Sequence, residues 1–142
     1  MTLTQGSRIF ADTIDTDPGG EVLVHTRKAV TLTEGSRIKA DILSTATVTG
    51  GDVTIETGQL SIQGDGSFIR ARRLGKTGQG GDLTVTATDF VELIDADGGL
   101  FAQTLGAKNA GTLTIDTRRL SVRDGARVFT GTRGEEREEI YL

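Results

Sequence analysis

Apolar residues alternate with polar ones along most of the chain, in short segments that glycine interrupts. Leu3 stands between two threonines, and Thr54 separates Val53 from Ile55. A two-residue period predicts β-strands with one buried face. These segments are rich in threonine, valine and isoleucine, and no stretch keeps the 3.6-residue period of a helix. The pattern therefore predicts an all-β protein of short strands joined by glycine turns.

The strand-like segments recur with a period of about thirty residues. Residues 2–11 return with substitutions at 31–40 and 121–130, and variants with one inserted residue begin at Ser61 and Glu92. A second block is led by paired small residues, and its second glycines are 31, 30 and 30 residues apart: Gly20, Gly51, Gly81 and Gly111. A repeat of this length indicates a solenoid, in which a coil buries its apolar face by stacking on its neighbours.

Aligning the repeats brings aliphatic residues to equivalent positions in successive coils. The first strand supplies Leu3, Leu32, Ile62, Leu93 and Val122, and the second supplies Ile9, Ile38, Ile69, Leu100 and Val128. In the second strand a small residue follows each of these aliphatic residues two positions later, as Ala40 follows Ile38. We expect a further core column three residues after the small residue, at Ile14, Leu43, Leu74 and Leu105.

We therefore predict a right-handed parallel β-helix, or β-solenoid, of about four to five coils with three strands per coil. Residues 1–133 are expected to form a single domain, and residues 134–142 an acidic tail or a degenerate last strand. The coils are expected near 1–29, 30–59, 60–90, 91–119 and 120–142. Segments that vary in length between coils predict loops along one side of the stack.

Composition narrows the chemistry that this chain can perform. It has 142 residues, no cysteine, a single histidine, His25, and a net charge of -4. Thiolate nucleophiles and two-histidine metal sites are therefore excluded within one chain. The negative charge argues against binding nucleic acid, which requires a basic face. We expect no cofactor, no nucleic-acid partner and no enzymatic activity.

Several motifs resemble the repeat region of filamentous-haemagglutinin-like exoproteins. They are Leu-Thr-Ile-x-Thr-x-x-Leu-Ser-Val-Arg-Asp-Gly-Ala-x-Val at 113–128, Asp-Phe-Val-Glu-Leu at 89–93 and Gly-Leu-Phe-Ala-Gln-Thr at 99–104. The resemblance covers about residues 1–133. It implies a right-handed parallel β-helix, two-partner secretion through an outer-membrane transporter, and a structural or adhesive role without catalysis.

The same resemblance implies a full-length parent that is secreted or held at the bacterial cell surface. The amino-terminal secretion domain of the family, with its Asn-Pro-Asn-Leu signature, does not occur in this sequence, and no signal peptide is recognised. We therefore expect a piece of a longer array. Its expected partners are further coils, a second copy stacked end to end, and surface glycans.

A basic cluster falls on the middle coil and its loop. It consists of Arg70, Arg72, Arg73 and Lys76. Arginine pairs bidentately with anionic groups, so one hypothesis for this cluster is a surface for a sulfated polysaccharide or for lipopolysaccharide phosphate. The interpretation that we favour is a solvated face with salt bridges to Asp52 or Asp82.

Two acidic turns have the alternating carboxylates and glycines that can wrap calcium. One contains Asp15 and Asp17, and the other contains Asp95 and Asp97. Calcium prefers oxygen ligands in a flexible loop, but aspartate and glycine are also good turn formers. A calcium-stabilised binding module is therefore one alternative function.

A carbohydrate-active β-helical enzyme is the other alternative. Such enzymes need convergent carboxylates in a groove. Glu92 lies near the acidic turn at Asp95 and Asp97, but the chain has no tryptophan and one tyrosine, Tyr141, to hold a sugar. The threonines expected to stack on the outer face of the third strand, such as Thr84, are interpreted as ordinary cross-strand packing.

Overall fold

The computed structural model describes residues 1–14, 19–43, 51–74, 79–105 and 110–133, which form twelve strands and no helix. None of the described residues lies in a helix long and apolar enough to span a bilayer. The strands are β1 (Thr2–Leu3), β2 (Arg8–Phe10), β3 (Val22–His25), β4 (Ala29–Leu32), β5 (Arg37–Ile42), β6 (Val53–Ile62), β7 (Phe68–Arg73), β8 (Leu83–Ile94), β9 (Gly99–Leu105), β10 (Leu113–Thr117), β11 (Leu120–Arg123) and β12 (Arg127–Arg133).

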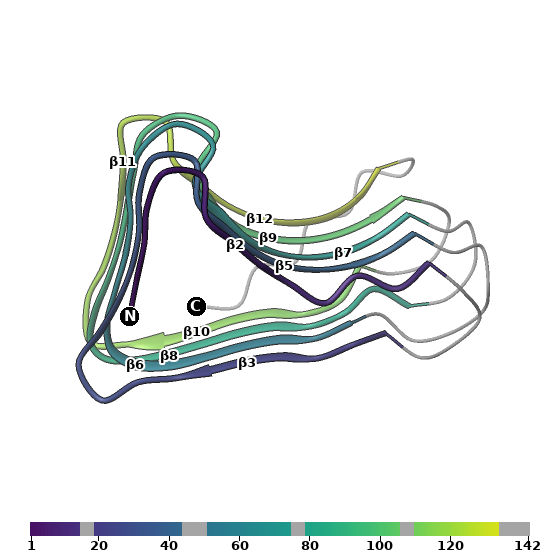
Figure 1. Cartoon of the computed structure of the whole chain (residues 1–142), viewed down its shortest axis with the longest axis horizontal. Coiled ribbons are helices and arrows are strands. Elements are labelled where there is room, and N and C mark those ends of the chain that lie inside the picture. The colour runs from purple at the N-terminus through teal and green to yellow at the C-terminus, as the bar shows by residue number, and fades with distance from the viewer. Residues whose placement is uncertain (15–18, 44–50, 75–78, 106–109, 134–142) are drawn as a thin grey trace.

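Every strand pairs with its neighbours in parallel, and the strands form two sheets. The second strands of the coils make a five-stranded sheet in the order β12-β9-β7-β5-β2. The first and third strands belong to one seven-stranded sheet, because β6 and β8 continue around a corner of the coil and pair on both sides of it. Equivalent strands run side by side on three sides of the stack (Figure 1). The predicted parallel β-solenoid with three strands per coil is confirmed.

The register of the sheets stacks equivalent residues directly over one another. Leu3 pairs with Leu32, Leu32 with Ile62, and Ile62 with Leu93. The side chains of Leu32, Ile62 and Leu93 are fully buried, and they belong to one continuous aliphatic cluster. Residues of the outermost coils, such as Leu3 and Val128, are only partly buried against it because they have a neighbouring coil on one side. The register of the predicted columns is therefore confirmed, and their inner members are buried, whereas Val122 is 41% exposed.

The additional core column expected at Ile14, Leu43, Leu74 and Leu105 was wrong. Ile14 is 77% exposed and Leu43 is 43% exposed. The alternation of β5 continues beyond Ile38 and Ala40, so Ile42 is the next buried residue and Leu43 faces outward. In the equivalent position of the next two coils, Arg73 and Thr104 are buried.

The turn between the first and second strands accounts for the repeated glycine. In the first coil the amide of Ser7 donates to the carbonyl of Thr4, at 3.0 Å, and Gln5 and Gly6 have φ angles of 53° and 70°. Two positive φ angles define a type I′ turn, which favours glycine. The third coil has one inserted residue before its second strand. There the amide of Ser67 donates to the carbonyl of Gly64, at 3.1 Å.

Candidate functional site

Two arginines of the predicted basic cluster, Arg70 and Arg72, donate hydrogen bonds to a buried carboxylate of the neighbouring strand. Asp41 in β5 has a fully buried side chain. It accepts hydrogen bonds from Arg70 of the next coil, with Nε to Oδ1 at 3.1 Å and Nη2 to Oδ2 at 2.6 Å. Arg72 Nη2 lies 3.1 Å and Lys39 Nζ 3.3 Å from Oδ2, and Lys39 also lies 2.6 Å from Asp12. We call these five residues the Asp41 cluster.

This arrangement gives the arginines a structural role. Three cations face two carboxylates in the Asp41 cluster, so most of its positive charge is compensated within the protein. For Arg70 and Arg72 the expected salt bridges to Asp52 or Asp82 are wrong, because both pair with Asp41, which lies beside Arg72 in register. Asp52 instead accepts a hydrogen bond from the amide of Asp82 at 2.8 Å, and Asp82 from the amide of Thr112 at 2.7 Å.

Arg73, another member of the predicted cluster, does not join this surface. Arg73 is fully buried because the alternation of β7 turns it inward, and burial lowers the pKa of its guanidinium. Burial, together with the charge of Arg70, also lowers the pKa of Arg72, while Asp41 opposes the shift. Lys76 lies outside the described residues.

The outer face of the five-stranded sheet carries aromatic side chains that the sequence analysis did not single out. Four of the five phenylalanines of the chain lie there, at Phe10, Phe68, Phe101 and Phe129. Each of them is next to a core residue such as Ile69 or Leu100, and the two-residue period therefore points it outward. We call this surface the Phe face. The alternation of the second strand was the signal that could have revealed it.

Cations of the same or of a neighbouring coil lie over these rings. The guanidinium carbon of Arg70 is 4.8 Å and that of Arg37 is 5.0 Å from the centroid of the Phe68 ring. Phe68 and Phe101 meet edge to face, with centroids 6.2 Å apart. Lys39 lies 5.6 Å from the ring of Phe10, which is 60% exposed. The Phe face therefore presents aromatic surface interleaved with positive charge.

The acidic turn at Asp95 is held by the coil beneath it. Asp95 Oδ2 accepts a hydrogen bond from the amide of Gly64 at 2.9 Å, and Asp95 and Asp97 have φ angles of 81° and 60°. In the described parts of the chain, no three histidine, aspartate or glutamate residues form a group able to hold a metal. Asp15 and Asp17 lie outside the described residues, so the calcium hypothesis stays a prediction.

The polar ladders run in the predicted register. Thr54 pairs with Thr84, and Thr84 with Thr114. On the first strand, Glu92 stands between Ser61 and Ser121, where Arg123 contacts it at 3.2 Å. The expected cross-strand stacking of the threonines on the third strand is confirmed.

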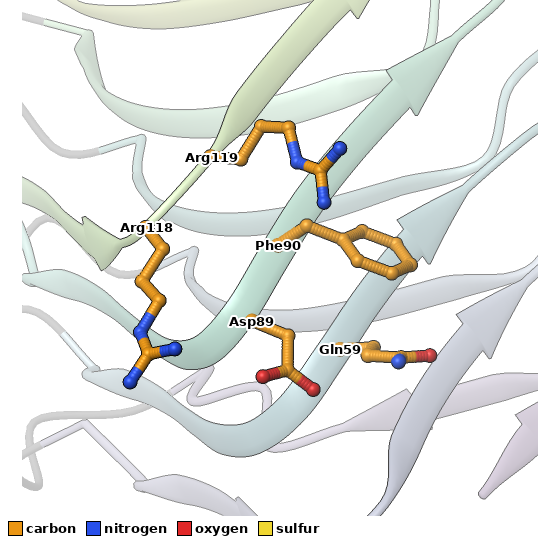
Figure 2. A pocket seen from close by; sticks show the side chains of 5 residues that line it. All are labelled: Gln59, Asp89, Phe90, Arg118 and Arg119. Carbon is orange, nitrogen blue, oxygen red and sulfur yellow. The ribbon is translucent and has the colours of Figure 1, made fainter.

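A hollow of about 420 Å³ lies at the corner where the third strand of one coil leads into the first strand of the next. It is lined by Gln59, Asp89, Phe90, Arg118 and Arg119 (Figure 2). Gln59 and Phe90 pair in register, and the register shifts just before them, because four residues of β8, from Ala87 to Phe90, oppose three of β6, from Thr57 to Gln59. We call this hollow the corner pocket.

No protein-family model, curated protein or solved structure matches this chain. Its relation to haemagglutinin-like exoproteins is therefore a proposal that rests on the repeat motifs.

Proposed function

We propose that this chain is a non-enzymatic structural and adhesive segment of a secreted or cell-surface exoprotein of the filamentous-haemagglutinin-like class. The in-register parallel stack supports this proposal, because a continuous aliphatic core makes a rigid rod whose outward side chains repeat from coil to coil. The motifs at 89–93, 99–104 and 113–128 support the proposed class. The full-length parent would leave the cell through an outer-membrane transporter.

The Phe face is the observation that carries the adhesive role. Phe10 is 60% exposed and Phe68, Phe101 and Phe129 are half-buried, so several aromatic side chains reach the same surface, and grouped exposed apolar residues are typical of interaction sites. Sugar rings present apolar C–H groups that pack on aromatic faces, and their hydroxyl groups hydrogen-bond to charged neighbours such as Arg37 and Lys39. We therefore propose that extended glycan chains of a cell surface lie along this face, across successive coils.

The proposal is tested by the binding of polymeric glycans to the wild-type chain and to a Phe68→Ala/Phe101→Ala variant. We expect the variant to bind roughly fivefold more weakly or worse, because a few aromatic anchors carry most of the energy of such surfaces. Leu23→Ala is the matched control, since it removes an exposed apolar side chain from the other sheet. Circular dichroism melting of all three proteins checks that the fold is kept.

The glycans are also assayed for new reducing ends. If the wild-type chain binds no glycan, or if both variants bind as tightly as it does, the adhesive proposal is wrong. Cleavage of an acidic glycan would instead favour the carbohydrate-active alternative.

A further inference from the structure

The corner pocket combines groups that contact different parts of one ligand. Figure 2 shows the guanidinium of Arg119 beside the ring of Phe90, and the guanidinium of Arg118 on the same side of the pocket as the carboxylate of Asp89. The ladder explains this neighbourhood, because the amide of Val91 donates to the carbonyl of Arg119 at 2.8 Å and so places Arg119 over Phe90. The pocket is therefore framed by β6, by β8 and by the link between β10 and β11.

The charges of this pocket differ from those of the Asp41 cluster. Neither Arg118 nor Arg119 forms an ion pair within the described part of the chain, and both are exposed. In the Asp41 cluster, by contrast, a buried carboxylate engages Arg70 and Arg72. Arg118 and Arg119 are therefore available to an external anion, unlike the arginines of the predicted basic cluster that Asp41 engages.

We propose that the corner pocket binds one sugar unit that carries an anionic group, a carboxylate or a sulfate. The two guanidinium groups point apart in Figure 2, and either of them can pair bidentately with two oxygens of such a group. The half-buried ring of Phe90 offers an apolar wall to the sugar, and Asp89 and Gln59 offer an acceptor and an amide to its hydroxyl groups. A hollow of about 420 Å³ is within the usual range of small-ligand sites.

The pocket favours an acidic sugar over other anions. Asp89 would repel the continuous phosphates of a nucleic acid, and the net charge of -4 adds to this repulsion. A free inorganic anion has no apolar surface to pack on the ring of Phe90 and no hydroxyl group to donate to the carboxylate of Asp89. This inference rests on the proposed adhesive function and names the sugar chemistry that it recognises.

The test is titration calorimetry with four probes: a trigalacturonate, a sulfated heparin tetrasaccharide, neutral cellotriose and a short oligothymidylate. Arg118→Ala/Arg119→Ala is compared with Arg27→Ala/Lys28→Ala, which removes two exposed cations from the same corner in the first coil, outside the pocket. We expect the pocket variant to bind an acidic oligosaccharide roughly tenfold more weakly or worse, and the control variant to stay within about twofold of wild type. Phe90→Leu should weaken binding without a change of charge.

Each outcome decides the inference. Selective loss with trigalacturonate assigns the carboxylate, and selective loss with the heparin fragment assigns the sulfate. Equal loss in both double variants, no binding of either acidic probe, or tighter binding of the oligothymidylate through Arg118 and Arg119 would overturn it. If polymeric glycans still bind to the Phe face of a protein that ignores acidic oligosaccharides, the pocket inference fails while the proposed function stands.

Discussion

The carboxylate of Asp41 and the guanidinium of Arg70 join two adjacent coils through a pair of parallel hydrogen bonds, at 3.1 Å and 2.6 Å. The Asp41 side chain is fully buried, whereas 16% of the Arg70 side chain is exposed. A buried carboxylate is tolerated only when charged donors satisfy it, and here Lys39 and Arg72 complete its shell. The Asp41 cluster therefore fastens β5 to β7 on the outer side of the sheet.

Asp41→Asn is expected to lower the free energy of unfolding by about 2–4 kcal/mol. The substitution keeps the shape of the side chain but leaves the three cations of the cluster with Asp12 alone. The partial exposure of these cations, up to 27% for Arg72, lets water compensate part of the loss. Urea unfolding followed by circular dichroism measures the effect.

Asp52→Asn is the control for that experiment. Asp52 is exposed and accepts one hydrogen bond from the amide of Asp82, which the amide oxygen of asparagine can also accept. We expect a loss below about 1 kcal/mol. Equal destabilisation by the two substitutions would show that Asp41 does not have the role described above.

The paired glycines allow the third side of the coils to approach closely. A Cβ atom on Gly51 would lie 2.6 Å from the carbonyl oxygen of Gly20 and 3.1 Å from the Cβ atom of Ala40. Backbone cannot move aside without breaking the ladder, so Gly51→Ala should cost about 1–3 kcal/mol in thermal or urea unfolding.

Gly6→Asn tests whether this cost comes from crowding. A Cβ atom on Gly6 meets nothing within 4 Å, and asparagine tolerates the positive φ angle of 70°. We expect a cost below about 1 kcal/mol. A larger loss for Gly6→Asn than for Gly51→Ala would contradict the packing explanation.

The stack could be predicted because one physical requirement repeats in every coil. Leu32, Ile62 and Leu93 must each be buried, and the period of about thirty residues aligns them with no knowledge of the loops. The column error at Leu43 has a local cause. The alternation of β5 continues through Ile42, whereas the prediction placed the next core residue one position later.

The side-chain partners were harder to predict. Arg73 was grouped with surface cations because arginine is seldom buried, yet its position in β7 is an inward one. The partner of Arg72 follows from the same column alignment when it is applied to outward positions, since Asp41 pairs with Arg72 in register. The corner pocket lies where β8 has one residue more than β6, and two-residue alternation does not indicate which side chains line such a register shift.

Calcium is expected to raise the melting temperature of the chain by less than about 1 °C. Calcium takes six to eight oxygen ligands, and the turn at Asp95 and Asp97 supplies two carboxylates, one of which is hydrogen-bonded to Gly64. Melting curves with calcium and with chelator measure the effect. A clear rise would contradict this expectation, and Asp95→Asn and Asp15→Asn variants would then show which acidic turn is responsible.

The strands of the first coil are expected to pair with a second copy of the chain or with further coils. Among the described residues β3 pairs on one side only, with β6, and its exposed Leu23 begins the ladder that continues through Thr54. Unpaired strand edges favour association, and charged side chains on an edge oppose it. Sedimentation velocity from low to high micromolar concentration should therefore show a rising mean mass for the wild-type chain and a smaller rise for Leu23→Lys.

Thr54→Lys adds the same charge to the same ladder one coil away from the edge, so it should associate as the wild-type chain does. A wild-type chain that stays monomeric throughout, or equal behaviour of the two lysine variants, would exclude pairing through this edge.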